Sequence, residues 1–395
     1  MKRKVIYLLT LLLTAMSAVA QDYDALLKQV VGNNTELSSL ESANESQIQA
    51  LRSENNLPET GIDLEHQWGQ KNIGNKWSVG ISQGFEWPGI YGARKDVARS
   101  ASEAMEYLNR SNYLEKMLEV KLLFIDIVNA RKNLRVMEQV CDYMSQLKTK
   151  YHDGFKQGEV SILDVNKIDI EHVAVSRRCN ELRIQLGVLQ NSLKTLNGGK
   201  DCSEIISMLD AYPEDVILSE DAYETMIKQN DPQLKYNSSM LQSQSAAVRV
   251  ARMGNLPGFT LGYMHVNELG SHFNGLKIGI SLPLFSNRHK SKAAEALRES
   301  IDYEQSTLEI AKFSTMYSNR AKAVKLYSEV EDYRGVFEKS DNLALLKKAL
   351  DGGEITLLTY LQEVNYFLEA QRDYMNLVYE YHYTLAQLNK YCLLK

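Results

Sequence analysis

Alternating apolar and polar positions mark four short segments of a chain whose remaining pattern is mostly helical. In 76–87, Trp77, Val79 and Ile81 fall on one parity, while serine and glycine fall on the other. A period of two is typical of β-strands. The pattern predicts strands over 61–70, 76–87, 259–266 and 275–284. Each has about ten residues, the length at which a tilted strand crosses a bilayer, although a soluble sheet with one buried face gives the same alternation.

The two strand pairs belong to two copies of one sequence plan. Leu57-Pro58 matches Leu256-Pro257 at a separation of 199 residues, and "GEVSILDV" from 158 matches "GEITLLTY" from 353 at 195. Matches that keep their order along the chain indicate an internal duplication. We predict a first repeat over 21–197, an equatorial connector over 198–219 and a second repeat over 220–395.

Four long stretches are free of proline, which a helix interior does not tolerate. They predict long helices over 89–150, 160–196, 287–349 and 355–392. In the last of these, one apolar seam starts at Leu357, and a second follows strict sevens through Tyr360, Phe367, Tyr374, Tyr381 and Leu388. Two seams indicate that the helix packs against a neighbour on each side.

The N-terminus indicates export. Lys2, Arg3 and Lys4 precede an apolar run and an Ala18-Val19-Ala20 cleavage pattern, which is typical of a signal peptide over 1–20. A membrane anchor is the alternative, but the run is shorter than the ~20 residues that a spanning helix needs. Four strands cannot close a membrane barrel, so if these strands span a membrane, several chains must pool them. Three chains would supply twelve strands, and two or four chains are also arithmetically possible.

Charge and candidate chemistry exclude other classes. A net charge of −5 without a basic stripe argues against nucleic-acid binding. "GISQG" at 80–84 satisfies G-x-S-x-G, but Ser82 stands within an alternating strand rather than on the strand-to-helix turn of a hydrolase. The seven histidines and four cysteines show no ligand-like spacing, so we expect no enzyme, metal or cofactor.

The cysteines also test the expected helix pairing. If 89–152 and 160–196 form a hairpin, residues whose numbers add to about 313 should lie level. Cys141 and Cys179 would then be offset by ~10 Å along the axis. A bridge needs Cα atoms within ~7 Å, so we expect these two thiols to be unlinked.

The combination of signal peptide, duplication, strand pairs, long helix pairs and turns of the form G-x-[VI]-[ST] resembles the TolC-like outer-membrane efflux family. The resemblance covers roughly 22–393, and "QGFEWPG" at 83–89 is similar to the heavy-metal branch. The lipid-attachment cysteine of many members of that branch is absent. The resemblance implies a mainly α fold with a small β part, in which coiled-coil hairpins form an α-barrel. It further implies a homotrimer whose four strands per chain close a twelve-stranded outer-membrane β-barrel, with a collar from 21–33 and 198–229.

The resemblance also implies partners and sites. The partners would be a periplasmic membrane-fusion adaptor, an inner-membrane pump of the RND type and outer-membrane lipid. The hairpin turns would be the adaptor-contact tips: Gly158, Glu159, Val160, Ser161, Gly353, Glu354, Ile355 and Thr356. The periplasmic gate would involve Thr359, Tyr360, Gln362 and Glu363, and the membrane girdle Trp68, Trp77 and Trp87.

The expected gate departs from the family. Thr359 and Gln362 occupy the places where several channels carry carboxylates, so we expect a gate closed by neutral packing around Tyr360, with Glu363 as the alternative charged ring. The function expected is an efflux channel for small molecules or metal ions. A periplasmic coiled-coil adaptor or scaffold and a duct for type I polypeptide secretion are the alternatives.

Overall fold

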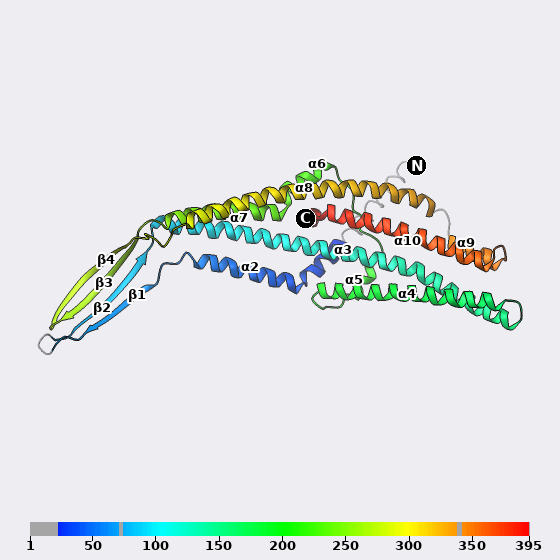
Figure 1. The fold of residues 1–395 in the computed structure, drawn as a ribbon, viewed down its shortest axis with the longest axis horizontal. Coiled ribbons are helices and arrows are strands. Elements are labelled where there is room, and N and C mark those ends of the chain that lie inside the picture. The colour runs from blue at the N-terminus through cyan, green and yellow to red at the C-terminus, as the bar shows by residue number, and fades with distance from the viewer. Residues whose placement is uncertain (1–22, 71–73, 338–341, 395) are drawn as a thin grey trace, which may run out of the picture. The chain divides into compact units, whose positions relative to one another are not determined.

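The computed structural model describes residues 23–70, 74–337 and 342–394 (Figure 1). The expected signal peptide over 1–20 lies outside these residues. Residues 23–32 are helical, and the elements that follow are α2 (Thr35–Ser53), β1 (Thr60–Gln67), β2 (Lys76–Phe85), α3 (Pro88–Lys156), α4 (Ile162–Leu196), α5 (Ser203–Met208), α6 (Glu220–Asn230), α7 (Pro232–Met253), β3 (Gly258–Glu268), β4 (Ser271–Ser281), α8 (Lys290–Phe337), α9 (Asn342–Asp351), α10 (Leu357–Leu388) and a closing 3₁₀ turn (Lys390–Leu394). Over the described residues, no helix combines the length and the apolar character that crossing a membrane requires.

The chain divides into two compact units. The first contains the described residues up to Ser38 together with 113–230 and 313 onward, and the second contains 39–112 and 231–312. Each expected repeat contributes to both units, so compactness and sequence duplication divide the chain differently. The repeat boundaries stay a prediction.

The second unit contains a four-stranded antiparallel sheet in the order β1-β2-β3-β4. One row across it joins Ile62, Ile81, Tyr263 and Leu276, and all four side chains are exposed. The next row joins residues of the opposite face, Gly61, Ser82, Gly262 and Lys277. The sheet therefore has one apolar, exposed face and one face of small and polar residues, as the alternation predicted.

Most strand boundaries differ from the expectation by one to four residues, most notably at the end of β1 and the start of β4. Strand β1 ends at Gln67, so Trp68 follows the strand, and β4 begins at Ser271 rather than 275. The cause of the second difference is a two-residue turn in which Leu269 and Gly270 have φ angles of 55° and 79°. Leucine is an unusual residue at positive φ, so the sequence carried no turn signal there.

In the first unit, both expected seams of α10 are present. Leu357, Leu361 and Val364 join a buried cluster with residues of α3 and α4, among them Met144 and Ile168. The second seam meets α8 through ring pairs, namely Tyr327–Tyr381, Tyr333–Tyr374 and Phe337–Phe367. The expected helix over 287–349 is described as α8 and α9, with 338–341 outside the described residues.

The register of the α3–α4 hairpin corrects the one expected from sequence. Side-chain contacts join Glu138 to Arg183 at 2.9 Å, Ser145 to His172 at 3.2 Å and His152 to Asp169 at 3.0 Å. The numbers of each pair add to 317 or 321 rather than 313, because α3 runs on to Lys156 and α4 starts only at Ile162. Cys141 and Cys179, whose numbers add to 320, therefore lie level, and the expected offset was wrong. The four cysteines are unbridged in the structure.

Candidate functional site

The turn between α3 and α4 is the first of two hairpin tips. Gly158 has a φ of +78°, a conformation that glycine adopts without strain. The amide of Glu159 donates to the carbonyl of Gly154 at 2.9 Å, and that of Gly158 to Phe155 at 3.0 Å. This pair of bonds closes the helix in a Schellman motif and satisfies carbonyls that the helix end leaves free.

The turn between α9 and α10 repeats this geometry. Gly353 has a φ of +75°. The amide of Glu354 donates to Ala349 at 2.8 Å, and that of Gly353 to Leu350 at 3.1 Å. The duplicated sequence therefore builds the same helix ending twice, with a glycine at the same left-handed position.

Each tip then starts its second helix with a hydroxyl cap. Ser161 accepts a bond from the amide of Asp164 at 3.2 Å, and Thr356 accepts one from Thr359 at 3.2 Å. Ser161 also donates to Asp164 at 2.7 Å, and this bond, followed by the charge of Lys167, lowers the pKa of the Asp164 carboxyl. The first tip thus carries an ionised carboxylate where the second carries the neutral hydroxyl of Thr359.

Most of the eight expected tip residues face solvent. The exceptions are Val160 and Ile355, which are half-buried. A Cβ added at Gly154 would lie 2.8 Å from the Val160 side chain, so Val160 closes over the end of α3. Ile355 packs against the buried cluster beneath α10. These two apolar side chains pack into the fold, whereas the remaining six tip residues are exposed: Gly158, Glu159, Ser161, Gly353, Glu354 and Thr356.

The tips also expose apolar side chains that the sequence reasoning missed. Leu163 on α4 is 66 % exposed and Leu358 on α10 is 51 % exposed, and both follow the cap by two residues. Phe155 and Ile162 are exposed beside the first of them. Each leucine lies off the buried seam of its helix, and this off-seam position was the available signal. Together they give the tips an exposed apolar surface.

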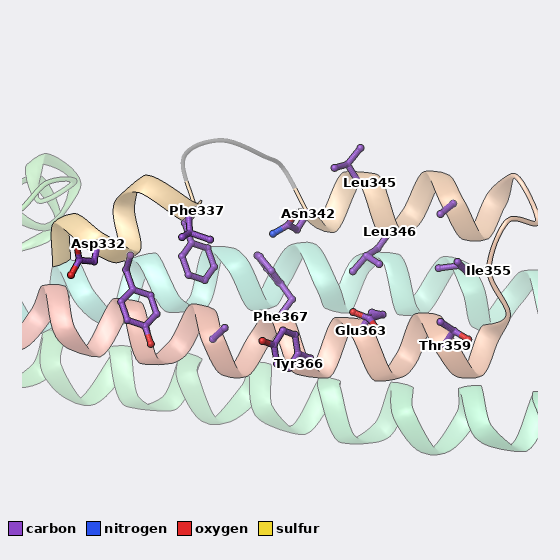
Figure 2. Close-up of a pocket in the computed structure, with 14 residues that line it drawn as sticks. Asp332, Phe337, Asn342, Leu345, Leu346, Ile355, Thr359, Glu363, Tyr366 and Phe367 are labelled. Atoms are coloured by element: carbon purple, nitrogen blue, oxygen red, sulfur yellow. The ribbon is translucent and has the colours of Figure 1, made fainter. Parts of the chain in front are cut away.

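The structure separates the four expected gate residues. Tyr360 is 2 % exposed, and its ring meets that of Tyr143 on α3 edge-on at 5.6 Å between centroids. Burial raises the pKa of both phenols, that of Tyr143 to about 12. Thr359 and Glu363 instead line a groove of about 900 Å³ beside α8 and α9 (Figure 2), and Gln362 is exposed. Within one chain, Tyr360 is therefore an anchor between helices, while Thr359 and Glu363 face another side of α10.

Further contacts join the two hairpins behind the tips. The ammonium of Lys347 on α9 lies 4.6 Å from the centre of the Tyr143 ring. Lys150 of α3 forms an ion pair with Asp351 of α9 at 3.1 Å. Both pairs are long-range in sequence and fall outside the periodic pattern, so no sequence signal identified them.

The three tryptophans lie at the ends of the strands, as expected. Trp77 near the start of β2 packs 5.5 Å from His265, and Trp68 follows the end of β1. Trp87 lies beyond the other end of β2, 6.1 Å from Phe259. Aromatic rings at both ends of a sheet's exposed apolar face are typical of an interfacial belt.

Neither the serine of the hydrolase-like pattern nor the possible metal-ligating residues form a reactive site among the described residues. Ser82 is within β2, paired with Gly61 and Gly262, and no helix follows it directly. Over the described ranges, no three or more His, Cys, Asp or Glu side chains gather where they could hold a metal ion.

Comparison with known proteins places this arrangement in a structural class. No family model and no curated protein matches the sequence. Solved structures do match: a membrane protein from Pseudomonas aeruginosa is similar with a TM-score of 0.75 and 17 % identity, over 93 % of this chain and 91 % of that one. The outer-membrane channel OprN is similar with a TM-score of 0.75 and 13 % identity, over 95 % and 89 %. The CmeC outer-membrane channel of Campylobacter jejuni is similar with a TM-score of 0.71 and 17 % identity, over 93 % and 84 %. The chain therefore has the TolC-like channel fold.

Proposed function

We propose that this protein is the outer-membrane channel subunit of a tripartite efflux system. The observation that carries the proposal is the sheet, which exposes an apolar face and presents small and polar residues on the other. Both of its edge strands are unpaired among the described residues. Unpaired edges are too costly in lipid, so the sheet must continue into other chains. The likeness to OprN and CmeC over nearly the whole chain supports the same function.

A homotrimer completes the barrel in this proposal. Three chains pool twelve strands, an even number within the range of outer-membrane barrels. The apolar face then meets lipid, with Trp68, Trp77 and Trp87 at the interfaces, and the glycine- and serine-rich face lines the lumen. The test is cell fractionation followed by sedimentation of the detergent-solubilised protein. Recovery in the outer membrane as three copies is expected, whereas a soluble periplasmic protein would favour the adaptor or scaffold alternative.

The tips would bind a periplasmic adaptor that connects the channel to an inner-membrane pump of the RND type. The exposed Leu163 and Leu358 would supply apolar contacts at the two tips. Leu163→Gln and Leu358→Gln should weaken adaptor capture and lower efflux without changing assembly, because neither side chain belongs to the core. Ile184→Gln, on the same helix and 68 % exposed, is the matched control. Equal loss of adaptor capture in the control would contradict docking at the tips.

The gate would close by neutral packing. Tyr360 would hold α10 against α3, and Glu363 would contribute no strong charged ring. Single-channel conductance should then show weak block by a multivalent cation on the periplasmic side, unchanged in Glu363→Gln. Strong block that disappears in this variant would instead assign a charged ring to Glu363.

A further inference from the structure

Two cysteines lie at the same level of the α3–α4 hairpin, one on each helix. The contacts Glu138–Arg183 and Ser145–His172 join the helices on either side of Cys141. Between them, the sulfur of Cys141 lies 3.7 Å from the hydroxyl of Ser176, one turn from Cys179 on the same helix. Cys179 is 1 % exposed, whereas Cys141 is half-buried. The two interhelical contacts therefore fix the register of α3 against α4, and this register places Cys141 level with Cys179.

The environment of Cys179 also indicates this contact. Burial raises the pKa of its thiol, the charge of Arg183 opposes this shift, and the nearby Cys141 adds to it. Cys179 is therefore a poor first nucleophile, because the thiolate is the reactive form and a buried thiol ionises reluctantly. The more accessible Cys141 can meet an external oxidant first, with Cys179 positioned behind it.

We propose that Cys141 and Cys179 form a disulfide site that fastens α3 to α4 under oxidising conditions. The Cys141 thiolate attacks the disulfide of an oxidant, such as glutathione disulfide or a thiol–disulfide oxidoreductase, and expels one of its thiolates. Cys179 loses a proton and attacks the Cys141 sulfur of the mixed disulfide, expelling the second thiolate. Two protein thiols lose two electrons and two protons, and the oxidant becomes two thiols.

In the second hairpin, aromatic stacking occupies the level at which we propose the disulfide in the first. Cys179 follows the tip glycine Gly158 along the chain by the same number of residues as Tyr374 follows Gly353. The two positions therefore correspond, at a separation of 195 residues. Tyr374 stacks on Tyr333 at 6.1 Å and on Phe337 at 5.3 Å, so aromatic rings hold α10 to α8 at that level. The first hairpin has two thiols at the equivalent level, where a disulfide would hold α4 to α3.

The remaining cysteines have other surroundings. Cys202 is buried and accepts a bond from the Asn197 side chain at 3.3 Å. Cys392 lies 3.9 Å from the sulfur of Met226. Neither contact brings a second thiol close, so both should stay reduced and serve as internal controls. The cellular compartment in which the bond closes rests on the proposed function, because a protein delivered to the outer membrane passes through an oxidising space.

The test is equilibration of the purified full-length protein in glutathione redox buffers, followed by acid quench, alkylation and peptide mapping without reduction. We expect one linked peptide pair, Cys141 with Cys179, and alkylated Cys202 and Cys392. In the Cys179→Ser background, Ser176→Cys should also link to Cys141, whereas Ser192→Cys, four turns along α4, should link at least tenfold less. These two variants test the register even if one substitution alters folding.

A Cys141–Cys179 pair that stays reduced while a Ser176→Cys pair oxidises would overturn the proposal. Linkage of either thiol to Cys202 or Cys392 would overturn it as well. Because this equilibrium is measured on purified protein, it decides the disulfide independently of fractionation. A protein found outside the outer membrane would therefore count against the channel and not against the bond.

Discussion

Replacing Gly198 with alanine tests the joint between α4 and α2 in the first unit. Gly198 ends α4 with a φ of +64°, and its amide donates to Thr195 at 3.1 Å. A Cβ at this position would lie 2.3 Å from the backbone oxygen of Asn33. Backbone cannot move aside as a flexible side chain can, so the end of α4 and the start of α2 must separate.

The cost follows from the contacts that separation breaks. Asn33 donates to the side chain of Asn197 at 2.9 Å, and Asn34 donates to the carbonyl of Leu196 at 3.0 Å. Two such bonds contribute about 2 kcal/mol together, and left-handed strain adds about 1 kcal/mol. Gly198→Ala should therefore lower the local stability by about 3 kcal/mol, which is roughly 150-fold in the opening equilibrium.

Gly199→Ala is the matched control, because Gly199 also has a positive φ, 79°, but among the described residues beyond its chain neighbours no atom lies within 4 Å of an added Cβ. It should lower the local stability by about 1 kcal/mol, from strain alone. The assay is amide hydrogen exchange in peptides covering 34–38 and 193–199 of the detergent-solubilised protein. Exchange should be about thirtyfold faster in Gly198→Ala than in Gly199→Ala. Equal exchange in the two variants would refute the argued contact with Asn33.

Other substitutions test single groups by thermal unfolding or exchange. Asp231 is buried, caps α7 and forms an ion pair with Lys312 at 3.1 Å. Asp231→Ala should therefore destabilise the protein by about 3–5 kcal/mol. Asp231→Asn should destabilise it less, because asparagine keeps the cap. Burial lowers the pKa of His382 to about 4, below the value near 6.5 of an unfolded chain. The unfolded state alone gains a proton between these values, so stability should fall by about 3 kcal/mol from pH 6.5 to 4, and His382→Phe should remove this dependence. Ser161→Ala should speed amide exchange at the start of α4 by roughly five- to tenfold through loss of its cap, and unchanged exchange would contradict that role.

The groups around His382 determine whether that pH test is clean. Its ring stacks on Tyr212 at 4.4 Å and meets Tyr381 at 5.2 Å, and its Nδ1 makes no hydrogen bond to any described residue. The charges that also lower its pKa are cationic: Lys132, Arg334 and Lys121. These cations stay protonated throughout the pH range, so the predicted slope belongs to His382. A slope that persists in His382→Phe would assign it to nearby carboxylates instead.

Periodicity and proline placement were sufficient to predict the strands and the long helices, but not the short helices α5 and α6. Alternation located all four strands, and the two seams of α10 correctly indicated that it packs against a neighbour on each side. Hairpin register was not predictable at this level, because a turn shifted by a few residues preserves every apolar seam. The sheet's apolar face was predictable from Ile62 and Leu276, whereas the turn at Leu269 was not, since leucine rarely adopts positive φ.

The candidate site was predictable where a special backbone conformation dictates the residue. Gly158 and Gly353 stand out in the sequence because only glycine adopts their φ angles without strain. The contacts behind the tips were not predictable: Tyr143 with Tyr360, and Lys150 with Asp351, join distant segments by side chains that ordinary helix surfaces also carry. Such pairs depend on how the hairpins lie together, which no local pattern specifies.

The contrast between residues that the backbone conformation requires and side chains that only join helices also describes how the two hairpins differ. Both tips keep the Schellman glycine and the hydroxyl cap, because these positions satisfy backbone groups that every helix end leaves free. Side chains that only fasten one helix to another are under no such requirement, and there the copies differ: thiols at Cys141 and Cys179 in one, stacked rings around Tyr374 in the other. The two hairpins therefore share the geometry of the turn and differ in the side chains along their helices. The two tips accordingly have the same backbone shape but different charge, with the carboxylate of Asp164 in one and the neutral hydroxyl of Thr359 in the other.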